Sequence, residues 1–157
     1  MISADPSRRR VPEHVVLERE PGLLERLAPE DRAAFEPIAV IQTSAAWEKM
    51  QRDVMPGLNA RDKAFLDRLW KGYAYSDEAP LRRVRFEKPA LIITGRQDSS
   101  VGYEEALDLL PRFPRATYAV LDRAGHNLQF DQTDVFEALA GEWLDRVERS
   151  WGADKRR

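Results

Sequence analysis

The chain has 157 residues, of which 43% are hydrophobic and 33% are charged, a composition typical of a folded domain and not of a disordered segment. Its 25 Lys and Arg residues nearly balance its 27 Asp and Glu residues, and the net charge of −2 supplies no field that attracts nucleic acid or an anionic membrane surface. The sequence contains no cysteine, which excludes disulfide bonds, thiolate metal sites and a cysteine nucleophile.

Residues 1–22 are polar and punctuated by proline, and they predict a connector. The arginines at positions 8–10 are not followed by the apolar stretch of a secretory signal, and no later stretch has the length and hydropathy of a membrane span. We therefore expect no contact with a membrane and a cytoplasmic location.

Residues 23–80 predict a cluster of short helices, because apolar side chains recur at helical spacing while Pro29, Pro37 and Pro56 interrupt the pattern. Several aromatic side chains in this region could line an apolar substrate pocket, but their spacing favours plain packing roles. These aromatic residues are Trp47, Phe65, Trp70, Tyr73 and Tyr75.

Residues 81–150 predict the order strand, helix, strand, helix. The apolar run 90–94 ends at Gly95 and is typical of a strand buried on both faces, and the run 117–121 is a second strand of similar length. Between them, a helix with acids in its first turn is expected to end at Pro111.

The last helix is predicted to begin at Thr133, whose side chain can cap it, and to carry apolar residues at four-residue spacing. Those residues are Val135, Leu139, Trp143 and Val147. Residues 151–157 are expected to form a polar tail.

This order predicts an α/β fold with two parallel strands joined by a right-handed crossover. Two strands are too few for an independent buried sheet, because their outer edges would expose unpaired backbone groups beside apolar side chains. We therefore expect further strands to come from elsewhere, or the chain to self-associate through the exposed edge.

Two polar residues follow the predicted strands. Asp98 lies just beyond the first strand and His126 just beyond the second, 28 positions later (126 − 98). The carboxyl ends of parallel strands meet at one edge of a sheet, where ligand chemistry is concentrated, so the two side chains should be neighbours. A carboxylate that accepts the Nδ1 proton of an imidazole fixes its tautomer and leaves Nε2 to take a proton. Singly, Asp98 would be interpreted as a turn residue and His126 as a loop histidine.

The segments 88–98 (Lys-Pro-Ala-Leu-Ile-Ile-Thr-Gly-Arg-Gln-Asp) and 124–129 (Ala-Gly-His-Asn-Leu-Gln), with the amphipathic final helix, resemble the C-terminal portion of lidded α/β-hydrolases. The resemblance implies that Asp98 is the acid and His126 the base of a catalytic triad. It also implies that residues 23–80 form the lid and that 81–150 are the last two strands of the hydrolase core with their helices.

No nucleophile is found. The Gly-x-Ser-x-Gly turn of that family is absent from the sequence, as is the glycine-bearing oxyanion loop. Ser44, Ser76, Ser99 and Ser100 do not lie at a strand-to-helix turn, so none is predicted to replace it. The other histidine, His14, is interpreted as a surface or packing residue, and the sequence offers no set of metal ligands and implies no cofactor.

Two hypotheses remain. In the first, the chain is the C-terminal half of a hydrolase for an ester, amide or related acyl substrate, inactive alone because the nucleophile lies on a front half in another polypeptide or in a longer gene. In the second, it is a non-catalytic remnant that binds a small molecule or a protein partner. Related folds use Ser, Asp or Cys as nucleophile, so the reaction class stays open.

Overall fold

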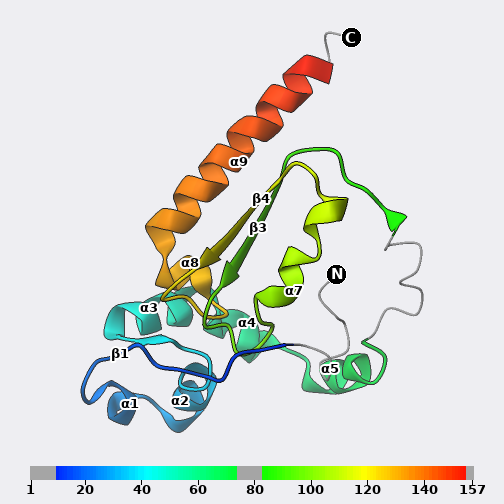
Figure 1. Ribbon diagram of the computed structural model, residues 1–157. Coiled ribbons are helices and arrows are strands. Elements are labelled where there is room, and N and C mark those ends of the chain that lie inside the picture. The colour runs from blue at the N-terminus through cyan, green and yellow to red at the C-terminus, as the bar shows by residue number, and fades with distance from the viewer. Residues whose placement is uncertain (1–9, 74–82, 155–157) are drawn as a thin grey trace.

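The computed structural model describes residues 10–73 and 83–154 of the chain (Figure 1). Its first part contains five helices and two very short strands. In chain order these are β1 (Glu18–Arg19), α1 (Leu23–Arg26), α2 (Pro29–Phe35), β2 (Ile41–Gln42), α3 (Ser44–Asp53), α4 (Met55–Ala60) and α5 (Lys63–Trp70).

The second part alternates strands with helices, as the sequence predicts. It contains β3 (Ala90–Gly95), α7 (Glu104–Leu107), the 3-10 turn η2 (Leu110–Arg112), β4 (Ala116–Leu121), α8 (Leu128–Asp131) and α9 (Thr133–Asp154).

Strands β3 and β4 form the predicted parallel pair, in register from Ala90 beside Ala116 to Gly95 beside Leu121. The expectation that β3 is buried on both faces is wrong for most of its length, since only Thr94 and Gly95 of this strand are buried. The reason is that this sheet has only two strands in the described residues, so most side chains of the pair stay half-buried.

Helices lie on both sides of this pair. Arg146 of α9 donates to the hydroxyl of Thr117 (2.8 Å), whereas the neighbouring Tyr118 donates its own hydroxyl to the carbonyl oxygen of Tyr103, just before α7 (2.6 Å). Because successive strand residues point to opposite faces, α9 and α7 cover opposite faces of the sheet. Figure 1 shows the carboxyl ends of both strands pointing toward the helices α3 and α4.

Three details differ from the sequence prediction. The helix expected before Pro111 is a single turn, α7, and Pro111 lies inside the following 3-10 turn, where its missing amide hydrogen costs nothing. Thr133 does not cap α9, because its hydroxyl donates to the carbonyl oxygen of Gln129 (2.9 Å). Helix α9 runs to Asp154, into the residues expected to form a tail.

The pairing of β1 with β2 was not predicted. Glu18 lies opposite Ile41 in a parallel pair, and the Glu20 amide donates to the carbonyl oxygen of Gln42 (2.8 Å). A hydrogen-bonded ion pair between Arg123 and Glu18 (2.6 Å) connects this small sheet to the loop after β4. Part of the predicted connector is therefore bound to the chain that follows β4.

The buried core lies among the helices of the first part. Phe35 and Trp47 meet edge to face, with ring centroids 5.5 Å apart, so the packing role predicted for Trp47 is confirmed. The cluster consists of Leu23, Leu24, Phe35, Trp47, Met50 and Met55. The same prediction is wrong for three other aromatic residues, which are exposed: Phe65 and Trp70 on α5, which buries none of its side chains, and Tyr73 just beyond it. Tyr75 lies outside the described residues.

Within ranges 10–73 and 83–154, none of the helices combines the length and the hydropathy needed to cross a membrane.

We expect the substitution Met50→Ala to lower the free energy of unfolding by about 2–5 kcal/mol, because it opens a cavity at a side chain that is only 2% exposed. Leu144→Ala on α9, where the side chain is 51% exposed, is the matched control and should cost about 1 kcal/mol or less. Urea unfolding of both variants measures the difference. Equal losses would contradict a core centred on the helices.

Candidate functional site

The loops after β3 and β4 touch along their backbones. A Cβ atom on Gly95 would lie 2.3 Å from the carbonyl oxygen of Gly125 and 2.4 Å from that of Ala124, distances that no side chain permits. The Gln97 amide donates to the Ala124 carbonyl oxygen (2.9 Å), and the Ala124 amide donates to the side-chain oxygen of Gln97 (3.1 Å). Glycine at position 95 therefore lets the two loops approach closely.

Asp98 is held by its own loop. Its Oδ1 accepts hydrogen bonds from the backbone amides of Ser100 (2.8 Å) and Val101 (3.0 Å), the turn geometry expected of an aspartate at a loop entry. The residue is only 7% exposed. These contacts leave Oδ2 directed at the neighbouring loop.

That oxygen meets the histidine. Oδ2 of Asp98 lies 3.2 Å from Nδ1 of His126, so the structure brings together the two residues that the sequence predicts as neighbours. The His126 side chain is 46% exposed, whereas the carboxylate behind it is largely shielded from solvent. The arrangement is a buried acid with a half-exposed imidazole in front of it.

The carboxylate form of Asp98 is favoured despite its burial. Burial by itself raises the pKa of Asp98. Its effect is outweighed by the hydrogen bond from His126, the hydrogen bonds from the Val101 and Ser100 amides, and the charge of His126. The net pKa of Asp98 lies below its ordinary value. The residue is therefore an anion at neutral pH, able to stabilise a charged imidazole.

A second acid, which the sequence analysis did not single out, holds the histidine loop. Oδ2 of Asp131, the last residue of α8, accepts a hydrogen bond from the amide of Gly125 (2.8 Å), next to His126. The only signal of Asp131 in the sequence is that an acid lies five positions after the histidine. The sequence alone does not show which backbone amide this acid contacts.

Comparison with solved structures relates the fold of this chain to known proteins. No protein-family model matches the sequence, and no curated protein matches it. A solved structure of an α/β superfamily hydrolase from Oenococcus oeni PSU-1 superposes with a TM-score of 0.82 at 32% identity, over 94% of this chain and 55% of that one.

The chain is related to the α/β-hydrolases over their C-terminal portion. A thermophilic esterase is similar in fold alone, with a TM-score of 0.53 at 18% identity, over 87% of this chain and 55% of that one. The chain thus spans little more than half the length of each of these structures.

Ser44 and Ser100, two of the serines that were not predicted to act as nucleophiles, are held by hydrogen bonds. Ser44 is bound through its hydroxyl (2.8 Å) and its amide (2.7 Å) to the carboxylate of Glu20, at the start of α3. The Ser100 amide binds Asp98, and Ser76 lies outside the described residues. The Ser44 hydroxyl is therefore bound to a carboxylate on its own part of the fold, and nothing in its contacts indicates a nucleophile.

Metal chemistry has no ligand set in the described part of the chain, where no group of three His, Cys, Asp or Glu residues could hold an ion. His14 is exposed in the segment before β1.

Replacing Asp98 by asparagine should make the chain less stable by an amount that depends on pH. Because the folded-state pKa of Asp98 lies below its unfolded value, the carboxylate contributes stability above the unfolded pKa of about 3.9 and loses it as the pH falls through the folded pKa. The stability difference between the native chain and Asp98→Asn should therefore narrow from pH 5 downward. Thermal melts between pH 6 and pH 2 measure it, and a constant difference would contradict the assignment.

Proposed function

We propose that this chain is the acid-and-base portion of an α/β-hydrolase that acts on an ester, an amide or a related acyl compound. Asp98 is the acid, His126 is the base, and the helices of residues 23–80 form the lid over the site. The observation that carries the proposal is the 3.2 Å contact between Asp98 Oδ2 and His126 Nδ1 at the carboxyl ends of β3 and β4.

The chemistry follows from the orientation of the imidazole. With Nδ1 bound to Asp98, Nε2 is the nitrogen that takes the proton of a nucleophilic hydroxyl while the oxygen attacks the acyl carbon. The imidazolium then passes this proton to the leaving group, and the acyl-enzyme forms. Water, deprotonated in the same way by Nε2, releases the acid and regenerates the nucleophile.

The electrostatics of the pair suit this cycle. The Asp98 carboxylate is held as an anion by two backbone amides, so it stabilises the imidazolium without being consumed as a proton acceptor. The exposure of the His126 ring allows a nucleophile and a substrate to approach it.

The nucleophile is proposed to lie on a front half, because about 45% of the Oenococcus oeni relative (100% − 55%) has no counterpart in this chain. In the described residues β3 pairs on one side only, with β4. We place the first strand of the front half against the other edge of β3, where its backbone groups need partners.

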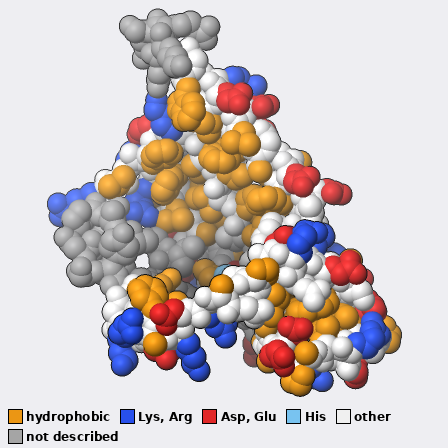
Figure 2. Space-filling model, turned by 180° about the vertical axis from the view of Figure 1, so that it is seen from behind, with side chains coloured by type: hydrophobic (Ala, Val, Ile, Leu, Met, Phe, Trp, Pro, Cys, Tyr) orange, Lys and Arg blue, Asp and Glu red, His pale blue; other side chains and the backbone are white. Residues whose placement is uncertain are grey.

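An apolar groove beside this edge supports that placement. It has a volume of about 340 Å³ and is lined by β3, α8 and α9 with no residue of β4, so it lies on the side of β3. Its walls are Leu91, Ile93, Leu128, Gln129, Phe136, Ala140 and Trp143. Figure 2 shows hydrophobic side chains gathered over the part of the molecule that holds the sheet and α9. Without the front half, the same surface favours self-association.

The alternative is a non-catalytic binding module, and the feature that favours it is the absence of a Gly-x-Ser-x-Gly segment from the sequence. Reading the coding DNA upstream of Met1 and in neighbouring genes separates the two. A Gly-x-Ser-x-Gly segment after a β-like run supports the hydrolase, and its absence from both places supports the binding module.

The direct test is hydrolysis of a chromogenic acyl ester by this chain, alone and together with the polypeptide that carries such a segment. We expect no turnover by the chain alone and turnover by the pair. His126→Ala should then lower kcat by on the order of 10³-fold or more, because the nucleophile loses its base.

The matched control is His14→Ala, which removes the other, exposed histidine and should leave the rate unchanged. A paired enzyme that loses no rate with His126→Ala would disprove the assignment of the base.

A further inference from the structure

Asp131 contacts the backbone amide of Gly125, the residue immediately before the histidine. Its Oδ2 accepts the Gly125 N–H at 2.8 Å, and its side chain is largely shielded from solvent at the end of α8. The contact spans six residues along the chain and closes a loop with His126 inside it. Movement of the Gly125 amide would therefore move the imidazole.

The other side of this peptide is also fixed. A Cβ atom on Gly125 would lie 2.7 Å from Cγ2 of Val40, a side chain with no exposed surface, and 3.2 Å from the carbonyl oxygen of Ile38. The residue before His126 is therefore held between the start of β2 and the carboxylate of Asp131.

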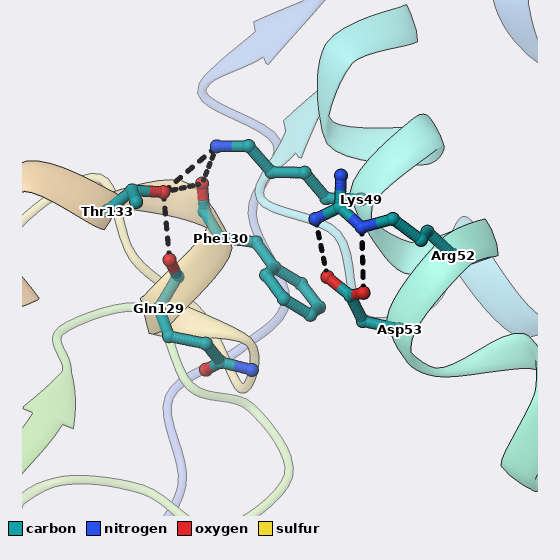
Figure 3. Close-up of polar contacts among 6 residues, drawn as sticks. All are labelled: Lys49, Arg52, Asp53, Gln129, Phe130 and Thr133. Carbon is teal, nitrogen blue, oxygen red and sulfur yellow. Dashed lines mark hydrogen bonds and ion pairs between the residues drawn. The ribbon is translucent and has the colours of Figure 1, made fainter.

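Lys49 of α3 holds the helix that carries Asp131. Its Nζ donates to the carbonyl oxygen of Phe130 (3.1 Å) and to the hydroxyl of Thr133 (2.9 Å), as Figure 3 shows. A cation at the carboxyl end of a helix satisfies carbonyl groups that have no partner within the helix. Helix α8 is thus attached to α3 through the contacts of Lys49 with Phe130 and Thr133.

The burial of Asp131 works against its charged form. Burial raises the pKa of Asp131, and the hydrogen bond from Gly125 and the charge of Lys49 oppose this only in part, so its pKa lies above its ordinary value. Burial of an acid is unfavourable, and this acid makes a specific contact next to the base. Both features are expected of a residue whose role is to place that base.

We propose that Asp131 is a positioning residue for His126, and that it keeps Nδ1 of the imidazole within reach of Asp98 by fixing the Gly125 amide. This inference rests on the proposed function, because it takes His126 to be the base. The inference goes beyond that function in one respect: the histidine is held by the helical segment (residues 23–70), through Val40 and Lys49, as well as by the sheet.

The test is NMR of the full chain, which contains only two histidines, so that His14 serves as an internal reference for His126. In Asp131→Ala we expect the His126 titration midpoint to move to lower pH, because the imidazolium loses the support of Asp98. We also expect loss of the protected Nδ1 proton signal that the Asp98 hydrogen bond maintains. Asp98→Asn should lower the midpoint as well, which provides the reference for a lost contact.

Two variants serve as controls. Asp131→Asn keeps an oxygen that can accept the Gly125 N–H, so it should restore both His126 signals. Asp134→Ala removes an exposed acid three residues further on and should change neither. If Asp131→Ala does not fold, Asp131→Ser replaces it, because its shorter side chain does not reach Gly125.

The inference is overturned if Asp131→Ala or Asp131→Ser melts at lower temperature while both His126 signals stay as in the native chain, since the role is then structural only. It is also overturned if Asp131→Asn fails to restore them. These readouts need no catalysis. Failure of the ester assay would disprove the proposed function, whereas the NMR signals alone decide whether Asp131 places the imidazole against Asp98.

Discussion

The hydrogen bond between Asp98 and His126 depends on the close approach of two loops, and most of the second part of the fold serves that approach. Parallel pairing of β3 with β4 brings both carboxyl ends to one edge, and Gly95 removes the side chain that would separate the loops. The amides of Ser100 and Val101 then hold one oxygen of the carboxylate, which leaves the other for the imidazole. Backbone geometry therefore orients the pair.

The helical segment, residues 23–70, stabilises the part of the fold that holds Asp98 and His126. It contains the buried core of the described residues, while β3 and β4, which precede the loops of Asp98 and His126, are mostly half-buried. Contacts from Val40 and Lys49 reach the loop of His126 and helix α8, so the more tightly packed part of the molecule supports the less packed part. A sheet of two strands could not hold the Asp98–His126 pair in place by itself.

Much of this fold was predictable from local patterns. The apolar runs that became β3 and β4 are bounded by proline, glycine and polar loops, and the crossover between them requires Asp98 and His126 to be neighbours. The two-residue strands β1 and β2 were missed because their signal is pairing between distant segments, with no periodicity of their own. Asp131 was missed for the same reason, since its partner is a backbone amide that no sequence pattern identifies. Phe65 and Trp70 are exposed because α5 buries none of its side chains, and helical spacing alone does not show how closely a helix packs against the rest of the fold.

The central claim is that the acid and base of a hydrolase lie on this chain and its nucleophile lies elsewhere. Labelling with a serine-directed fluorophosphonate, followed by mass spectrometry of the labelled peptide, tests it most directly in the chain paired with its front half. The account predicts a label on the serine of the Gly-x-Ser-x-Gly segment, with none on this chain. A label on a serine of this chain that disappears in the His126→Ala variant would contradict it.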